Sequence, residues 1–110
     1  MDSTPLIKTC TVDRLITRPD DVAKAVRGEK TAQRRNGLYA DPGERWTMAG
    51  RTFEMVAVSR QALGAMSDDD ARAEGYASLE AYREAILALH PGMPWLPQAQ
   101  VWVHEFTRCD

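Results

Sequence analysis

Alternating apolar and polar side chains predict the clearest β-strand of the chain at residues 52–59. Phe53 and Met55 would lie on one face of this strand, and Val56 and Val58 would lie on the other. Successive side chains of a strand point to opposite faces, so apolar residues at both sets of positions indicate that both faces are at least partly covered. We therefore expect neighbouring structure to pack on both sides of this strand.

Three further segments have the composition of strands. Residues 101–106 alternate and predict a final strand. Residues 44–48 predict a short strand with Trp46 and Met48 on one face. Residues 5–16 mix β-branched and apolar residues and predict a first strand.

A helix is expected between the first two strands, because Pro19 suits a first helical turn and Gly28 suits a helix C-cap. A second helix would begin at Ser67, with Asp70 at the capping-box position, and would end near Gly75. Ser78 can cap a third helix. The apolar face of that helix is spaced at helical intervals and consists of Leu79, Tyr82, Ile86 and Leu89.

This order of elements predicts an α+β fold, with a small mixed or barrel-like sheet and about three helices. The chain has 110 residues, of which 44% are hydrophobic and 27% are charged, as expected for one globular domain over residues 1–110. It contains no run of ~20 apolar residues that would span a membrane. It also lacks a secretory signal at its N-terminus, so we expect a cytoplasmic protein without membrane partners.

The net charge of −2 does not suggest a protein that coats DNA, and no DNA partner is expected. Charge is nevertheless segregated along the chain. Residues 24–35 hold five basic residues against Glu29, a local charge of +4. Residues 68–84 hold six acidic residues against Arg72 and Arg83, a local charge of −4. Either these segments are solvated faces that attract each other, or the basic strip binds anions and receives a carboxylate from the acidic segment.

The basic strip contains side chains suited to recognition of a polar ligand. If it runs extended after Gly28, Thr31, Gln33 and Arg35 share one face and Lys30 lies in the preceding turn. Arginine binds phosphates or base edges with two hydrogen bonds, and glutamine offers both a donor and an acceptor. A lysine beside a second cation can serve as a base, because like charge favours its neutral form.

Metal and nucleotide-cofactor motifs are absent from the sequence. His90 and His104 have no HExxH or cysteine-pair context. The Gly-x-Lys-Thr ending at residues 28–31 lacks the upstream glycine of a phosphate loop and follows the predicted helix instead of preceding one. We predict neither a protein-built metal site nor a cofactor.

Three segments together resemble the ASCH family, a PUA-like group. Residues 28–35 resemble the family motif Gly-x-Lys-x-x-Thr-x-Arg, and residues 41–46 resemble the segment before the next strand. The third segment is Ala73-Glu74-Gly75-Tyr76, which is similar to a Glu-Gly-aromatic segment of the family. The likeness extends over residues 8–107 and implies a small PUA-like β-barrel of mixed strands, flanked by about three helices.

The resemblance also implies that the protein handles RNA or a modified nucleoside. Some similar small proteins are amidohydrolases that deacetylate N4-acetylcytidine, and others are described as ribonucleases. Carried over by position, the catalytic lysine and glutamate are Lys30 and Glu74, and the motif arginine is Arg35. The motif threonine is Gln33 here, which cannot act as a hydroxyl nucleophile.

Two hypotheses for the function therefore stand. The first is a hydrolase of N-acylated nucleosides or of RNA, with Lys30 and Glu74 as catalytic residues. The second is a non-catalytic module that binds a nucleotide or single-stranded RNA, which the glutamine favours; a strip that contacts a protein partner is a third option. In the first two hypotheses we expect the ligand to be held by Thr31, Gln33, Arg34, Arg35 and Tyr39, with the tyrosine stacking on a base.

Overall fold

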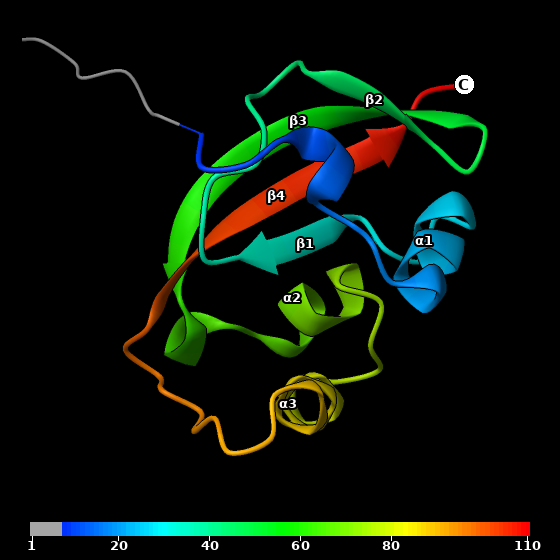
Figure 1. Ribbon diagram of the computed structural model, residues 1–110. Coiled ribbons are helices and arrows are strands. Elements are labelled where there is room, and N and C mark those ends of the chain that lie inside the picture. The colour runs from blue at the N-terminus through cyan, green and yellow to red at the C-terminus, as the bar shows by residue number, and fades with distance from the viewer. Residues whose placement is uncertain (1–7) are drawn as a thin grey trace, which may run out of the picture.

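An open four-stranded antiparallel sheet forms the centre of the computed structural model, which describes residues 8–110 (Figure 1). The strands lie in the order β1-β4-β3-β2, so β1 is an edge strand. Their bounds are β1 Ala32–Arg35, β2 Arg45–Met48, β3 Arg51–Ala62 and β4 Gln100–Arg108. The predicted strands at 44–48, 52–59 and 101–106 are all present, and β3 is longer than the pattern indicated.

The sheet is not a barrel of mixed strands. All three strand pairings are antiparallel, and in the described part of the chain β1 and β2 remain at opposite edges without pairing. The α+β class is confirmed, whereas the sequence expectation of mixed strands in a barrel is not. The alternation of apolar and polar residues within one strand cannot show whether a sheet closes into a barrel. Closure depends on which strands pair and on how they tilt.

A β-bulge at residue 56 changes the faces of β3. The register shifts between Met55, which pairs with Phe106, and Ala57, which pairs with Glu105. Val56 is 56% exposed, while Val58 packs against the same core as Met55. The prediction that the two valines share a face opposite Met55 is therefore wrong, because one extra residue reverses the alternation beyond it.

The predicted first strand is also wrong over residues 8–16, and its residues 5–7 lie outside the described part. A 3-10 turn, η1 Val12–Arg14, stands in its place. Val12, Leu15 and Ile16 are buried in the main core. Their apolar side chains cover one face of the sheet, and the segment does not pair with a strand of the sheet.

Three helices follow the predicted signals, and their bounds are α1 Pro19–Val26, α2 Asp68–Ala73 and α3 Leu79–Leu89. Ser67 and Asp70 form the expected capping box of α2, and the hydroxyl of Ser78 accepts a hydrogen bond from the backbone of Ala81. A short 3-10 turn, η2 Leu63–Ala65, lies between β3 and α2. No helix among residues 8–110 is long and apolar enough to cross a membrane.

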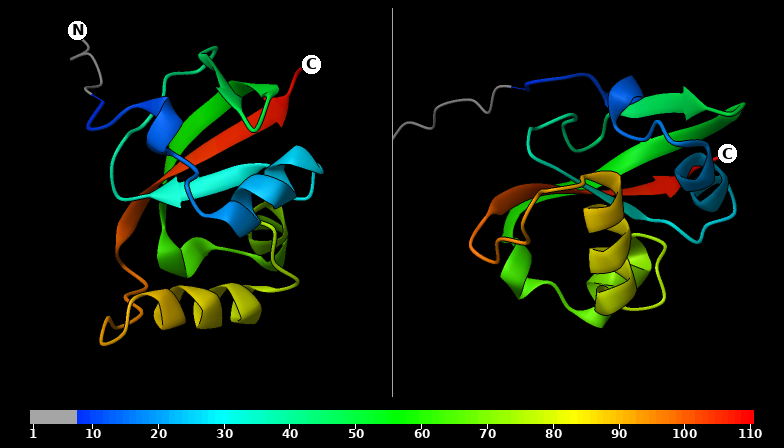
Figure 2. Two further views of the ribbon diagram at one scale, coloured as in Figure 1. Left: turned by 45° about the vertical axis from the view of Figure 1, so that its right-hand side comes forward. Right: turned by 60° about the horizontal axis from the view of Figure 1, so that its bottom comes forward.

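Two apolar clusters lie on opposite sides of the sheet. One lies on the side of η1 and contains the mutually packed rings of Trp46, Phe53 and Phe106. The other joins α2 and α3 around Tyr82 and Met66. Figure 2 shows α2 and α3 together on one side of the sheet and η1 on the other.

Replacement of Phe53 by alanine should lower the free energy of unfolding by about 3–5 kcal/mol, because this fully buried ring packs against two other aromatic rings. Urea denaturation, monitored by tryptophan fluorescence, measures this change in the free energy of unfolding. Val56→Ala on the exposed bulge is the matched control, for which we expect a change within about 0.5 kcal/mol. Equal losses in the two variants would contradict this assignment of the core.

Candidate functional site

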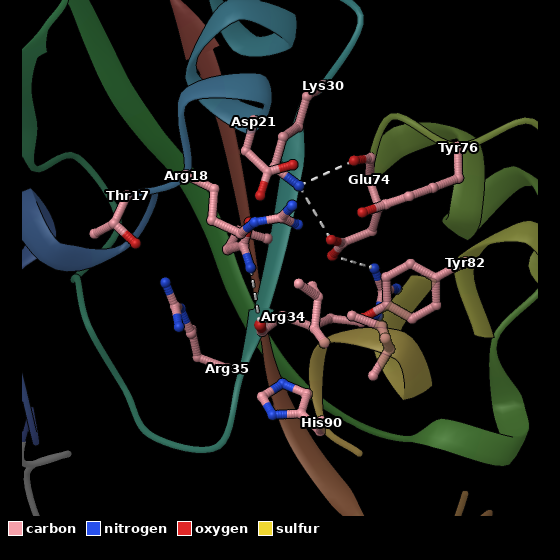
Figure 3. Close-up of a pocket in the computed structure, with 13 residues that line it drawn as sticks. Thr17, Arg18, Asp21, Lys30, Arg34, Arg35, Glu74, Tyr76, Tyr82 and His90 are labelled. Carbon is pink, nitrogen blue, oxygen red and sulfur yellow. Dashed lines mark hydrogen bonds and ion pairs between the residues drawn. The ribbon is translucent and has the colours of Figure 1, made fainter. Parts of the chain in front are cut away.

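A buried ion pair joins the two residues that the sequence singled out as catalytic. The Lys30 ammonium lies 3.1 Å from Oε1 of Glu74 and also donates to the Glu74 backbone carbonyl at 2.9 Å. Each residue is only 2% exposed. Figure 3 shows both side chains meeting where the chain after α1 approaches the end of α2. The two predicted residues thus share one site.

Arg34 supplies a second cation to the same carboxylate. Its Nη1 donates to Oε2 of Glu74 at 2.9 Å, so each carboxylate oxygen has its own cationic partner (Figure 3). The rest of the guanidinium donates to Oε1 of Gln61 at 3.1 and 2.8 Å. Arg34 is itself buried, and burial of an unpaired guanidinium would be costly. Its hydrogen bonds to Glu74 and Gln61 offset that cost.

The network continues from Gln61 to the start of α2. Nε2 of Gln61 donates to Asp70 at 3.2 Å, and Asp70 also accepts from the backbone of Ser67. Burial alone would raise the pKa of the Asp70 carboxyl, but the hydrogen bonds from Ser67 and Gln61 and the nearby Arg34 outweigh it, and the pKa is lowered. The capping residue of α2 is therefore connected to Glu74 at the other end of that helix.

Two glycine turns bring the partners together. Gly28 has a φ of +81°, and beyond it the backbone N–H groups of Glu29 and Lys30 both donate to the carbonyl of Lys24. Gly75 has a φ of +97° directly after Glu74. Left-handed backbone of this kind favours glycine, which explains why a glycine lies directly after Glu74 and another lies two residues before Lys30.

The two turns are also tied to each other. The backbone N–H of Thr31 donates to the carbonyl of Ala73 at 2.7 Å, and Nζ of Lys24 donates to the carbonyl of Gly75 at 2.9 Å. These bonds fix the start of β1 against the end of α2, so the basic segment and the acidic segment meet at the ion pair. The opposed charges of the sequence thus attract each other in the fold and also place a carboxylate among the cations.

The ion pair lies at the wall of a pocket of about 290 Å³ beside the edge strand β1. The walls come from the segment leading into α1, from β1, from the end of α2 and from α3. The lining residues are Thr17, Arg18, Asp21, Lys30, Gln33, Arg34, Arg35, Glu74, Tyr76, Tyr82, Ile86, Leu89 and His90. Charged groups thus occupy one side of the pocket, and aromatic and aliphatic groups occupy the other.

Gln33 carries a buried acceptor without a hydrogen-bond partner. Its Nε2 donates to the carbonyl of Arg34 at 3.2 Å, which fixes the orientation of the amide. Its Oε1 is buried and accepts no hydrogen bond from any described residue. An unpartnered buried acceptor costs about 1–3 kcal/mol, so a residue that lines a pocket with one is a candidate ligand contact.

Arg35 lines the pocket, but its guanidinium is held by backbone. It donates to the carbonyl of Leu15 at 2.7 and 3.1 Å and lies 5.3 Å above the ring of Tyr39. The arginine next to Lys30 in the site is therefore Arg34 and not Arg35. Alternation along β1 had placed Arg35 with Gln33 on one face, and it did not indicate that Arg34 would reach Glu74.

Two of the predicted ligand residues lie outside the pocket. Thr31 has an exposed side chain and contributes backbone hydrogen bonds to Ala73 and Phe106. Tyr39 packs edge-on against His104, with ring centroids 5.9 Å apart, beneath Arg35. Neither residue is in position to contact a ligand bound beside Glu74.

His104 fixes the strand that carries Gln33. The backbone N–H of Tyr39 donates to its Nε2 at 3.0 Å, so that nitrogen is unprotonated and Nδ1 carries the proton, which it donates to the carbonyl of Gln33 at 3.1 Å. The ring is fully buried and neutral. Burial lowers the pKa of His104 below its ordinary 6.5.

Sequence reasoning missed several residues of the site. Tyr82 and Ile86 were expected only as core, yet they also line the pocket. Burial raises the pKa of the Tyr82 hydroxyl and favours its neutral form. Gln61 gave no signal in the sequence, because its role depends on pairing between distant strands. Among residues 8–110, no group of three or more His, Cys, Asp or Glu could hold a metal ion.

Comparison with known proteins identifies solved structures of similar fold. No family model matches the sequence, and no curated protein matches it. Among solved structures, an ASCH domain from Lactobacillus crispatus JV V101 superposes with a TM-score of 0.65 and 20% identity, over 81% of this chain and 70% of that one. The chain has an ASCH-like fold.

A second structure agrees with this ASCH-like fold. A protein from Enterococcus faecalis V583, assigned to the family model DUF984, superposes with a TM-score of 0.60 and 19% identity, over 81% of this chain and 66% of that one. The resemblance drawn from the sequence motifs is therefore confirmed at the level of an ASCH-like domain. An activity on N4-acetylcytidine remains a prediction.

Glu74→Gln should destabilise the ASCH-like domain by about 3–5 kcal/mol, because it leaves Lys30 and Arg34 buried without their counter-charge. Lys30→Met should cost less, since Glu74 keeps its partner Arg34. Urea unfolding of the variants gives the values. Glu54→Gln, which breaks an ion pair with Arg45 at the surface, is the control and should change stability little.

The stability of the protein should also decrease as the pH is lowered, because of His104. Its lowered pKa means that the unfolded chain binds more protons below pH 6.5, so the free energy of unfolding decreases as the pH drops from 6.5 toward the native pKa. His104→Gln keeps a donor and an acceptor but cannot be protonated, and it should flatten this slope below about pH 6.5. An unaltered slope in His104→Gln would refute the assignment.

Proposed function

We propose that this ASCH-like domain binds a nucleoside, free or within RNA, with one edge of the base against Gln33 and Lys30. The observation that carries the proposal is the buried Oε1 of Gln33, which has no partner among the described residues although Gln33 lines a pocket. A ligand that donates a hydrogen bond to this oxygen would remove the cost of leaving it unpaired.

Lys30 would complement Gln33. Its ammonium has three N–H groups, and two of them are directed to the carboxylate and the carbonyl of Glu74. The third can donate to a ligand in the pocket that Lys30 lines. A donor next to an acceptor matches a base edge or an amide, each of which carries a carbonyl or ring nitrogen beside an N–H.

The size and the walls of the pocket support a ligand of this kind. Its volume of about 290 Å³ lies just below the usual range for small-molecule sites, which suits one nucleoside and not a folded RNA element. Tyr82 and Ile86 offer an aromatic and an aliphatic surface to a flat ring. Arg18 and Arg35 line the same pocket and are suited to a phosphate or a sugar hydroxyl.

Hydrolysis of an N-acylated nucleoside is the second candidate, and the Lys30–Glu74 pair favours it. Lys30 would donate to the acyl oxygen, and Glu74 would accept a proton from an attacking water and return it to the departing amine. The products would be a carboxylic acid and the nucleoside amine. Gln33 replaces the hydroxyl of the family motif, so water would have to attack directly.

Binding is tested by isothermal titration of the purified protein with cytidine and with N4-acetylcytidine. Gln33→Leu should weaken binding by about 5- to 150-fold, the equivalent of about 1–3 kcal/mol, while leaving the protein folded. Gln100→Leu alters an exposed glutamine on β4 and should bind as the wild type does. Absence of binding by folded wild-type protein, or equal affinity of the two variants, would refute the proposal.

The same samples separate hydrolysis from binding. Chromatography of N4-acetylcytidine after incubation would show cytidine if the second candidate is correct, and Lys30→Met should abolish its formation. Tight binding without product would leave a binding module and exclude this reaction.

A further inference from the structure

A row of three side chains crosses the sheet from the pocket. Arg35 of β1 pairs in register with Trp102 of β4, and Trp102 pairs with Arg60 of β3. Residues directly opposite each other in antiparallel strands have side chains on the same face, with Cβ atoms about 4.5–5.5 Å apart. The arginine–tryptophan row, meaning Arg35, Trp102 and Arg60, therefore extends about 10 Å from the pocket wall to the third strand.

The two arginines of this row carry uncompensated charge. Neither makes an ion pair with any residue in the described range 8–110, whereas Arg45, Arg51 and Arg108 on the same sheet all have acidic partners. Arg35 donates only to backbone carbonyls. Glu105 of β4 pairs with Ala32, and alternation along β4 places its side chain on the face opposite to that of Trp102. Two positive charges thus lie on one face of a chain whose net charge is negative.

The row also has a surface on which a base can stack. The guanidinium of Arg60 lies 4.9 Å from the centroid of the Trp102 ring. Arg60 is exposed and Trp102 is half-buried, so the stacked pair is accessible from solvent. Aromatic rings and arginine planes are the groups on which unpaired bases of single-stranded RNA stack, and arginine also binds the phosphates between them.

We propose that the arginine–tryptophan row binds the nucleotide next to the one in the pocket, so that the ligand is a single-stranded RNA segment and not a free nucleoside. This inference rests on the proposed function of the pocket. Arg35 connects the two sites, because it lines the pocket and begins the row. It would hold the phosphate that joins the two nucleotides, while Arg60 and Trp102 hold the second base and its phosphate.

The experiment compares a fluorescently labelled cytidine tetranucleotide, measured by anisotropy, with cytidine, measured by titration. The tetranucleotide should bind at least about tenfold more tightly, the effect of one additional stacked base. Arg60→Ala should remove much of this gain without changing the affinity for cytidine. It should also reduce the slope of log affinity against log salt by about 0.7, as expected for one lost phosphate contact on a single strand.

Arg83→Ala is the matched control. Arg83 also stacks on a tryptophan, Trp95, at 5.2 Å and makes no ion pair within the described residues, but it lies on α3 outside the pocket and the row. This variant should bind the tetranucleotide as the wild type does. Trp102→Leu supplies a second test of the row, and Arg60→Ala remains decisive if the tryptophan variant does not fold, because Arg60 is an exposed residue.

The outcomes distinguish the two proposals. Two results would refute binding at the arginine–tryptophan row and leave the proposal for the pocket intact. One is binding of cytidine with no additional affinity for the tetranucleotide. The other is an equal loss of tetranucleotide affinity in Arg60→Ala and Arg83→Ala. Binding of neither ligand would overturn both proposals. If polyglutamate displaced the labelled tetranucleotide as strongly as unlabelled RNA does, the row would be a site for acidic peptides. That result would refute the assignment to RNA.

Discussion

The carboxylate of Glu74, held between Lys30 and Arg34, is the interaction on which the rest of the site depends. Three charged groups buried together are tolerated only if each is paired and hydrogen-bonded, because desolvation of an unpaired ion costs several kcal/mol. The network meets this demand at both carboxylate oxygens and extends to Gln61 and Asp70. It ties the edge strand β1 to α2 at the wall of the pocket, so the same contacts maintain the structure and shape the site.

Much of this arrangement could be predicted from local sequence. Glycine at positions 28 and 75 marked the two turns, and Ser67 and Ser78 marked the helix starts. The segregated charges indicated that a carboxylate could enter the basic strip, and the resemblance to the ASCH family identified Lys30 and Glu74. These features are encoded by a few neighbouring residues, whose backbone preferences and capping hydrogen bonds act locally. The ASCH-like fold followed from the same motifs in order, and the structural comparisons agree with it.

The features that could not be predicted depend on contacts between distant strands. The bulge at Val56 is defined by the pairing of β3 with β4, and it moved Val58 to the face of Met55. Gln61 entered the site through the same pairing. The sequence favoured Arg35 over Arg34 as the arginine of the site. Only the positions of α2 and η1 determined that Arg34 binds Glu74 and that Arg35 binds the carbonyl of Leu15. Residues 8–16 resembled a strand because their apolar side chains cover the sheet.

Lys30 performs one more task, at the end of α2. Glu74 is the C-cap residue of that short helix, where the helix dipole disfavours a carboxylate and favours a cation, and Lys30 also donates to its carbonyl. One ammonium thus caps the helix and neutralises the acid. A ligand that draws this ammonium into the pocket would weaken the last turn of α2, and fraying of that turn would in return alter affinity for the ligand. Such a ligand would link its own occupancy to the order of the helix, and the link would act in both directions.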